Sequence, residues 1–254
     1  MVTNVPTVPP NDGGDFFGKI MKSAMNLPFV HVDRNSFLKK EFKPYFQEET
    51  INRIIKNGPR GIVDKKLIDK IAKGCISYHT TVVCSVSALA GLPGGWTMAA
   101  TIPADIAQFY GHVLSLTQKL LYLYGWPSLD EEEGEMTDDT TQILIIFMGI
   151  MLGAQGAEAA IKTLLKAFSE QVEKRLAKKA LTKVGIYKVA KEICKWIGIK
   201  LTKEGFTKGV GKLVPIIGAP VSAGITYWTF RPMARKLREE LDNEWKNNEI
   251  PPLA

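Results

Sequence analysis

Apolar residues three and four positions apart recur along most of the chain, a spacing typical of amphipathic helices. The first helical stretches are DFFGKIMKSAMN and SFLKKEFKPYFQEETINRIIKNG, after which Gly58 and Pro59 interrupt the pattern. No segment carries a convincing strand pattern, and no repeat of fixed period is found. The chain is therefore predicted to be all-α, a single compact multi-helix bundle in which Gly and Pro break buried apolar hairpins.

The longest uncharged run extends from position 74 to position 104 and includes no Lys, Arg, Asp or Glu. A long helix is predicted over residues 64–91, amphipathic in its first half and apolar on every face in its second. The LPGG sequence that follows permits a tight turn. The next helix is predicted to begin near Trp96 or at Pro103 and to run to Tyr124. The run therefore predicts a helical hairpin rather than one membrane span.

A further continuous helix is predicted from the acidic residues near 138 to about residue 181. Its residues 143–157 are uncharged, and beyond Glu158 it becomes basic and amphipathic. Small residues four positions apart, Gly149, Gly153 and Ala157, predict a face that another helix approaches closely.

The third uncharged stretch, residues 213–230, is only marginally long enough to cross a bilayer and contains two prolines. The segment RPMARKLREELDNEWKNN that follows it predicts a charged, exposed helix. The expected organisation is a flexible tail at residues 1–14, one helical domain over residues 15–248 and a second tail at residues 249–254.

The positive charge of the chain is concentrated in one segment. Residues 162–212 contain 14 Lys or Arg and 4 Glu, a net charge of +10, whereas the whole chain carries +7. A solvated helix face would account for this, but the neighbouring apolar segments favour docking on an anionic membrane surface. Nucleic acid is not an expected partner, because no zinc-finger, helix-turn-helix or RNP pattern is present. The expected membrane contacts are Lys174, Arg175, Lys178, Lys179, Lys188, Lys191 and Lys195.

Three scattered cysteines, Cys75, Cys84 and Cys194, do not form a disulfide framework and predict buried thiols in a reducing compartment. The first residues, MVTNVPTVPPNDGG, have neither the basic start nor the apolar core of a signal peptide. The expected location is cytoplasmic, with peripheral attachment at the inner face of the cell membrane.

Several motifs in order resemble the EcsC family of bacterial helical proteins. They are GLPGG, the helix that opens with IPAD and ends in YGW, the later LGAQGAEAA, and VPIIGAPVSAGITYWTF. The resemblance spans roughly residues 72–235 and implies a mostly helical fold. Because the family's gene lies beside a transporter operon, the resemblance also implies a function linked to membranes. It implies no catalytic residue. No phosphate-binding loop of a transporter ATPase is present.

One helix face carries the residues best suited to chemistry. Asp105, Gln108, His112, Ser115 and Lys119 are spaced three and four apart, which places them on one side of the predicted helix. Asp105, His112 and Lys119 are the candidate catalytic residues, and Asp105, Gln108, His112 and Ser115 the candidate ligand contacts. The alternative is an ordinary polar seam between helices.

No metal site and no cofactor are expected. Cys75 and His79 are four residues apart and share a helix face, but Cys84 faces about 180° away from Cys75 on an ideal helix. A zinc ion would therefore need ligands from the next helix, such as His112 or Asp105.

Three functions remain open. The favoured one is a non-enzymatic, membrane-associating protein whose basic segment docks on anionic lipid and whose apolar hairpins partly insert. The second is an enzyme or small-ligand binder that uses the Asp105 to Lys119 face. The third is an interaction module linked to a transporter or secretion system, with residues 232–248 as its exposed arm.

Overall fold

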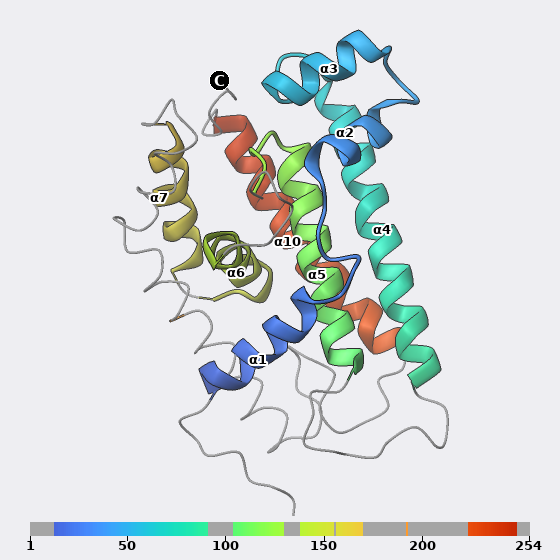
Figure 1. Cartoon of the computed structure of the whole chain (residues 1–254), viewed down its shortest axis with the longest axis vertical. Helices are drawn as coiled ribbons and strands as arrows, with labels where there is room; N and C mark the ends of the chain where they lie inside the picture. The colour runs from blue at the N-terminus through green and yellow to red at the C-terminus, as the bar shows by residue number, and fades with distance from the viewer. Residues whose placement is uncertain are drawn as a thin grey trace, which may run out of the picture.

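The computed structural model describes residues 13–90, 104–129, 138–154, 156–169, 192 and 223–247. Over these ranges it consists of eight packed helices without a strand, which confirms the predicted all-α class. The helices are α1 (Gly13–Met25), α2 (Arg34–Phe42), α3 (Glu48–Asn57), α4 (Lys65–Ala90), α5 (Ala104–Leu123), α6 (Asp138–Leu152), α7 (Ala157–Ser169) and α10 (Ala223–Asn247) (Figure 1).

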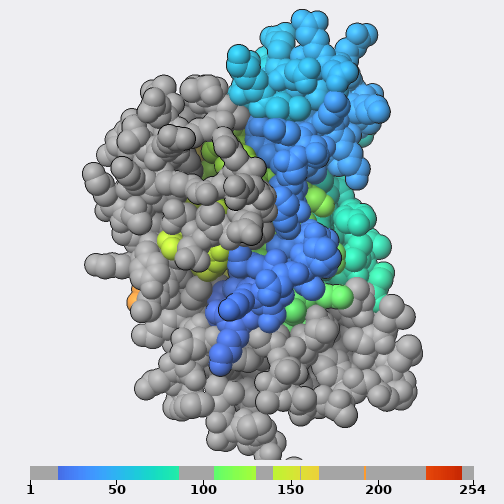
Figure 2. Space-filling view, viewed as in Figure 1, coloured from blue at the N-terminus to red at the C-terminus, as the bar shows by residue number. Residues whose placement is uncertain are grey.

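Helix α5 is the central element of the bundle. It contacts α1, α2, α4, α6 and α10. Figure 2 shows the blue α1 and α2, with the loop between them, lying in front of much of the green α5. From Ile106 to Leu123 every side chain of α5 is buried except Gln108 and Lys119, which are partly exposed. Because each buried large apolar side chain contributes about 1.5–3 kcal/mol, this helix supplies a large part of the core energy.

Local signals set the start of α4 and the end of α5 where the sequence predicted them. The Asp64 carboxylate accepts the backbone N–H of Lys66 at 2.7 Å and so caps the first turn of α4. At the other end of α5, Gly125 adopts a φ of 94° and the Trp126 N–H donates to the Leu121 carbonyl at 3.0 Å. This pairing is a Schellman motif, which favours glycine at the left-handed position. The turn between α4 and α5 lies outside the described residues.

The continuous helix predicted from about residue 138 to 181 is wrong, because α6 ends at Leu152. Gly153 adopts a φ of 73°, and the Ala154 N–H donates to the Gly149 carbonyl at 2.8 Å. Gly153 therefore ends α6 in a second Schellman motif, and α7 starts afresh at Ala157. The predicted small-residue face does not exist as one helical face, since its middle glycine is the break.

The prediction of an exposed C-terminal helix is also wrong. Helix α10 packs against α4, α5 and α6. Its apolar side chains recur at helical spacing and form a buried stripe beneath the charged outer face. The stripe consists of Phe230, Met233, Ala234, Leu237 and Leu241. Because this stripe is part of the core, residues 232–247 do not form a free arm.

Helices α4, α5 and α10 share one end, here called the hairpin end, where α4 finishes and α5 and α10 begin (Figure 1). Phe109 near the start of α5 makes an edge-on ring contact with Phe230 near the start of α10, at 5.7 Å between centroids. At the opposite end, Lys65 Nζ of α4 lies 2.6 Å from Asp242 Oδ1 of α10. The α4 and α10 helices therefore run antiparallel. Of the helices that the structure describes, none combines the length and apolar character needed to cross a membrane.

Candidate functional site

The predicted polar face of α5 lies inside the bundle. His112 and Ser115 are buried, whereas Gln108 and Lys119 are partly exposed. Asp105 lies in the first turn of α5, and its side chain is outside the described set. The structure therefore brings His112 and Lys119 into one polar cluster, while a pocket shared with Asp105 stays a prediction.

A chain of three nitrogen bases connects α5 to α4. Lys119 Nζ lies 2.9 Å from His79 Nε2, and His79 Nδ1 lies 3.1 Å from His112 Nδ1. His79 is 2% exposed and His112 is 7% exposed. The two imidazole rings meet edge-on, with centroids 5.3 Å apart. This cluster, which we call the base chain, forms a buried polar contact between the two arms of the hairpin.

Hydrogen-bonding capacity fixes the protons along the base chain. A lysine ammonium has only donors, so Lys119 donates to His79 Nε2. His79 then carries its proton on Nδ1 and donates it to His112 Nδ1, which leaves the proton of His112 on Nε2. The base chain therefore carries a single positive charge when both imidazoles are neutral.

Burial keeps both imidazoles neutral. Desolvation, with the Lys119 charge as the second cause, lowers the pKa of His112 to about 4. The same two causes, together with His112 itself, lower the pKa of His79 to about 2. Desolvation also lowers the pKa of Lys119. A second proton is therefore strongly resisted while the helices stay packed.

Aromatic side chains cover the base chain at both ends. Phe29 stacks on the His112 ring with centroids 4.4 Å apart and planes 22° apart. Lys119 Nζ lies 5.6 Å from the ring centroid of Tyr78, which is 61% exposed. The His112 end is thus sealed by apolar packing, and the Lys119 end is the one closer to solvent.

The base chain does not assemble a metal site. Cys75 lies one turn before His79 and is buried, and burial raises the pKa of its thiol to about 12. Across the described ranges, no three His, Cys, Asp or Glu side chains converge as metal ligands. A thiol with so high a pKa is also a poor nucleophile.

The sequence pattern suggested a role for His79 only as a metal ligand and did not predict its pairing with His112. The available signal was the hairpin itself, since His79 lies about three turns before the end of α4 and His112 lies about two turns after the start of α5. Because a helix rises about 1.5 Å per residue, these positions lie at similar depths in two antiparallel helices.

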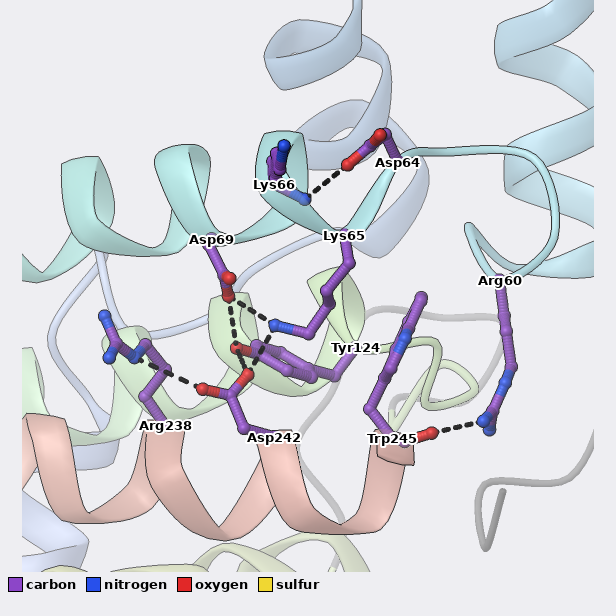
Figure 3. Close-up of polar contacts among 9 residues, drawn as sticks. All are labelled: Arg60, Asp64, Lys65, Lys66, Asp69, Tyr124, Arg238, Asp242 and Trp245. Carbon is purple, nitrogen blue, oxygen red and sulfur yellow. Dashed lines mark hydrogen bonds and ion pairs between the residues drawn. The ribbon is translucent and has the colours of Figure 1, made fainter. Parts of the chain in front are cut away.

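A second polar cluster at the opposite end of the bundle connects α4, α5 and α10 (Figure 3). The Tyr124 hydroxyl donates to Asp242, whose carboxylate also lies 2.6 Å from Lys65 Nζ and 3.7 Å from Arg238 Nε. Asp69 completes the cluster through Lys65. Burial and the Asp242 carboxylate raise the pKa of Tyr124. The positive charges of Lys65 and Arg238 balance the negative charges of Asp69 and Asp242. We therefore interpret this cluster as one that stabilises the packing of the helices.

Exposed aromatic residues gather on α10 near the hairpin end. Trp228 is 77% exposed and Tyr227 is 37% exposed. The Arg231 guanidinium lies 5.2 Å from the ring centroid of Tyr227, and Arg235 is exposed one turn further along. Tyrosine and tryptophan are the aromatic residues enriched at membrane–water interfaces. We call Tyr227, Trp228, Arg231 and Arg235 the aromatic–basic patch.

The seven basic residues predicted to contact a membrane, from Lys174 to Lys195, lie outside the described residues. No protein-family model, curated protein or solved structure matches the chain. The resemblance to the EcsC family therefore stays a prediction that rests on its sequence motifs.

Proposed function

We propose that this protein binds the surface of anionic membranes through the hairpin end of its helical bundle, without acting as an enzyme. The observation that carries the proposal is the position of two uncharged segments of the sequence relative to the packed helices. Two uncharged segments, residues 91–103 and 213–222, adjoin the helix ends that meet there. The sequence therefore attaches these two apolar segments to the same end of the bundle.

The aromatic–basic patch also supports membrane contact at the hairpin end. A bilayer interface accommodates the apolar body and polar edge of an indole or phenol ring, and arginines beside them pair with lipid phosphates. An indole as exposed as that of Trp228 has little stabilising role within the fold, whereas insertion at an interface would bury it. The basic segment at residues 162–212 adds the long-range attraction to anionic headgroups that its charge of +10 predicts.

The opposite end of the bundle has a different character. There the charged side chains of Lys65, Asp69, Arg238 and Asp242 pair with one another and hold three helices together. Charges that are paired within the protein contribute little to attraction by headgroups. We therefore assign membrane contact to the hairpin end and structural cohesion to the opposite end.

Flotation on sucrose gradients tests this function with the full chain. We expect flotation with anionic vesicles, made of phosphatidylcholine and phosphatidylglycerol mixed two to one, and little flotation with phosphatidylcholine alone. Raising the salt to 0.5 M should weaken binding, because surface electrostatics are screened. Absence of the protein from both floated fractions would refute the proposal.

Two variants locate the surface. W228S should reduce flotation several-fold, and R231Q combined with R235Q should reduce it selectively on anionic vesicles. Y45S is the matched control, because Tyr45 is also exposed, at 43%, but lies between α2 and α3 on another part of the bundle. Equal loss in Y45S and W228S would contradict the assignment to the hairpin end.

A further inference from the structure

The base chain holds the two arms of the hairpin together with a bond that acid can break. His79 belongs to α4 and His112 to α5, and their Nδ1 atoms face each other at 3.1 Å. Such a contact needs one proton between two nitrogens. A further proton on His112 Nδ1 would set two N–H donors against each other and add an imidazolium charge to that of Lys119 in a buried site.

We propose that His79 and His112 form an acid-sensitive latch, and that protonation of this pair separates α4 from α5 and frees the hairpin at the hairpin end of the bundle. The separation of α4 from α5 would occur without a membrane. Only its role in exposing apolar surface to a bilayer rests on the proposed function.

The charges around the latch oppose a second proton. Lys119 of α5 already donates to His79 and carries the positive charge of the base chain. From α2, Lys40 and Glu41 act on Lys119 with opposite signs. The Cys75 thiol on α4 stays neutral because burial raises its pKa to about 12. Among these groups only Glu41 is a carboxylate, and no ion pair between a described carboxylate and either histidine is found.

The direction of the pH effect follows from proton counting. In the closed hairpin, burial and Lys119 lower the pKa of both histidines, to about 4 for His112. Once solvated in an open hairpin, each would titrate near its ordinary value of about 6.5. The open form therefore binds more protons than the closed form, and acid favours opening as the pH falls from about 6.5 to about 4.

The position of the latch explains why opening would be local. Phe29 covers His112, and the neighbouring Gly111 faces Leu27, Phe29 and Val30 of the loop between α1 and α2. The second polar cluster ties α4 to α10 near Lys65, well away from His79 along α4. Loss of the latch therefore weakens the contact between α4 and α5 around His79 and His112, while the end of the bundle near Lys65 stays attached.

Hydrogen–deuterium exchange of the full chain without lipid, at pH 7.5 and pH 5.0 with correction for intrinsic rates, tests the latch. Peptides from residues 76–85 and 106–116 should exchange at least ten-fold faster at pH 5.0, whereas peptides of α6 should change little. H79Q combined with H112Q keeps polar side chains but removes the titration, so it should abolish the difference. Equal acid response in this variant, or no selective response in the wild type, would overturn the latch.

Two further measurements keep the test decisive. If circular dichroism shows that the double variant is unfolded at pH 7.5, H112Q alone replaces it; its acid response should be smaller than that of the wild type, because one of the two titrating imidazoles is gone, and an undiminished response would overturn the latch. Flotation with the same anionic vesicles at both pH values separates the two proposals. Acid opening without flotation refutes membrane binding and retains the latch, while equal flotation at both pH values without opening refutes the latch and retains membrane binding.

Discussion

The Val32 backbone N–H donates to the side-chain oxygen of Gln118 at 3.1 Å, and so fixes the loop before α2 onto the central helix. The Gln118 amide nitrogen also donates to the Val30 carbonyl at 2.8 Å. Gln118 is fully buried, and this loop carries the Phe29 ring that covers His112. One side chain thus positions the apolar cover of the base chain.

Replacing Gln118 by Leu should destabilise the protein substantially. The Val32 N–H and the Val30 C=O would both lose their partner in a buried site, at about 1–3 kcal/mol for each unsatisfied group. We expect a total loss of about 2–6 kcal/mol in the free energy of unfolding, measured with urea. Q108L is the control on the same helix, because Gln108 is partly exposed. An equal loss in both variants would contradict the role of Gln118.

Two helical glycines should respond oppositely to alanine. A Cβ at Gly111 would lie 3.0–3.1 Å from the side chains of Leu27, Phe29 and Val30, closer than ordinary contact, whereas one at Gly74 meets nothing within 4 Å. G74A should therefore stabilise by about 0.5–1 kcal/mol through helix propensity. G111A should instead destabilise by about 1 kcal/mol, because crowding outweighs that gain. Thermal unfolding of both variants checks the difference in sign, and stabilisation by G111A would show that the loop packs more loosely.

The Asp242 carboxylate should matter far more than an exposed one. In D242N the side chain keeps its shape but loses the charge that faces Lys65 and Arg238, and the acceptor of the Tyr124 hydroxyl becomes weaker. We expect a loss of about 1–3 kcal/mol in urea unfolding. E48Q should cause no measurable change, because the Glu48 pair with Lys39 lies in solvent. Similar stability of the two variants would contradict a tying role for the second polar cluster.

Cys75 should be inert in the native protein. With a pKa of about 12, its thiolate fraction at pH 8 is about 10⁻⁴, and the thiol is buried as well. Cys84 is only partly buried, so iodoacetamide at pH 8 should label Cys84 much faster. Peptide mass spectrometry resolves the two sites, and urea should remove the difference. Rapid native labelling of Cys75 would show that the α4–α5 contact opens readily at neutral pH.

Local sequence signals predicted the helical hairpin well. The Asp64 cap marks the start of α4, Gly125 marks the end of α5, and Pro103 precedes the first described residue of α5 in the sequence. These signals act within a turn or two of the chain, so periodicity and capping are sufficient to find them.

Tertiary packing determines features of the fold that local sequence patterns do not predict. The charged residues of α10 predicted exposure, yet the stripe from Phe230 to Leu241 occupies the core. Gly153 lies within an otherwise continuous apolar pattern, and nothing local distinguishes a helical glycine from one that ends a helix. His112 and Lys119 of the predicted α5 face come together only through His79 of α4, a pairing that depends on helices distant in sequence.

Quenching of tryptophan fluorescence by brominated phospholipids in the anionic vesicles tests most directly whether the hairpin end contacts the bilayer. Trp228 and Trp245 lie near opposite ends of α10, about 26 Å apart along the helix axis. If the hairpin end docks, W228F should lose a clear share of the quenching seen in the wild type, and W245F should lose none. Loss of quenching in W245F with full quenching in W228F would place the opposite end on the membrane and contradict the proposed function.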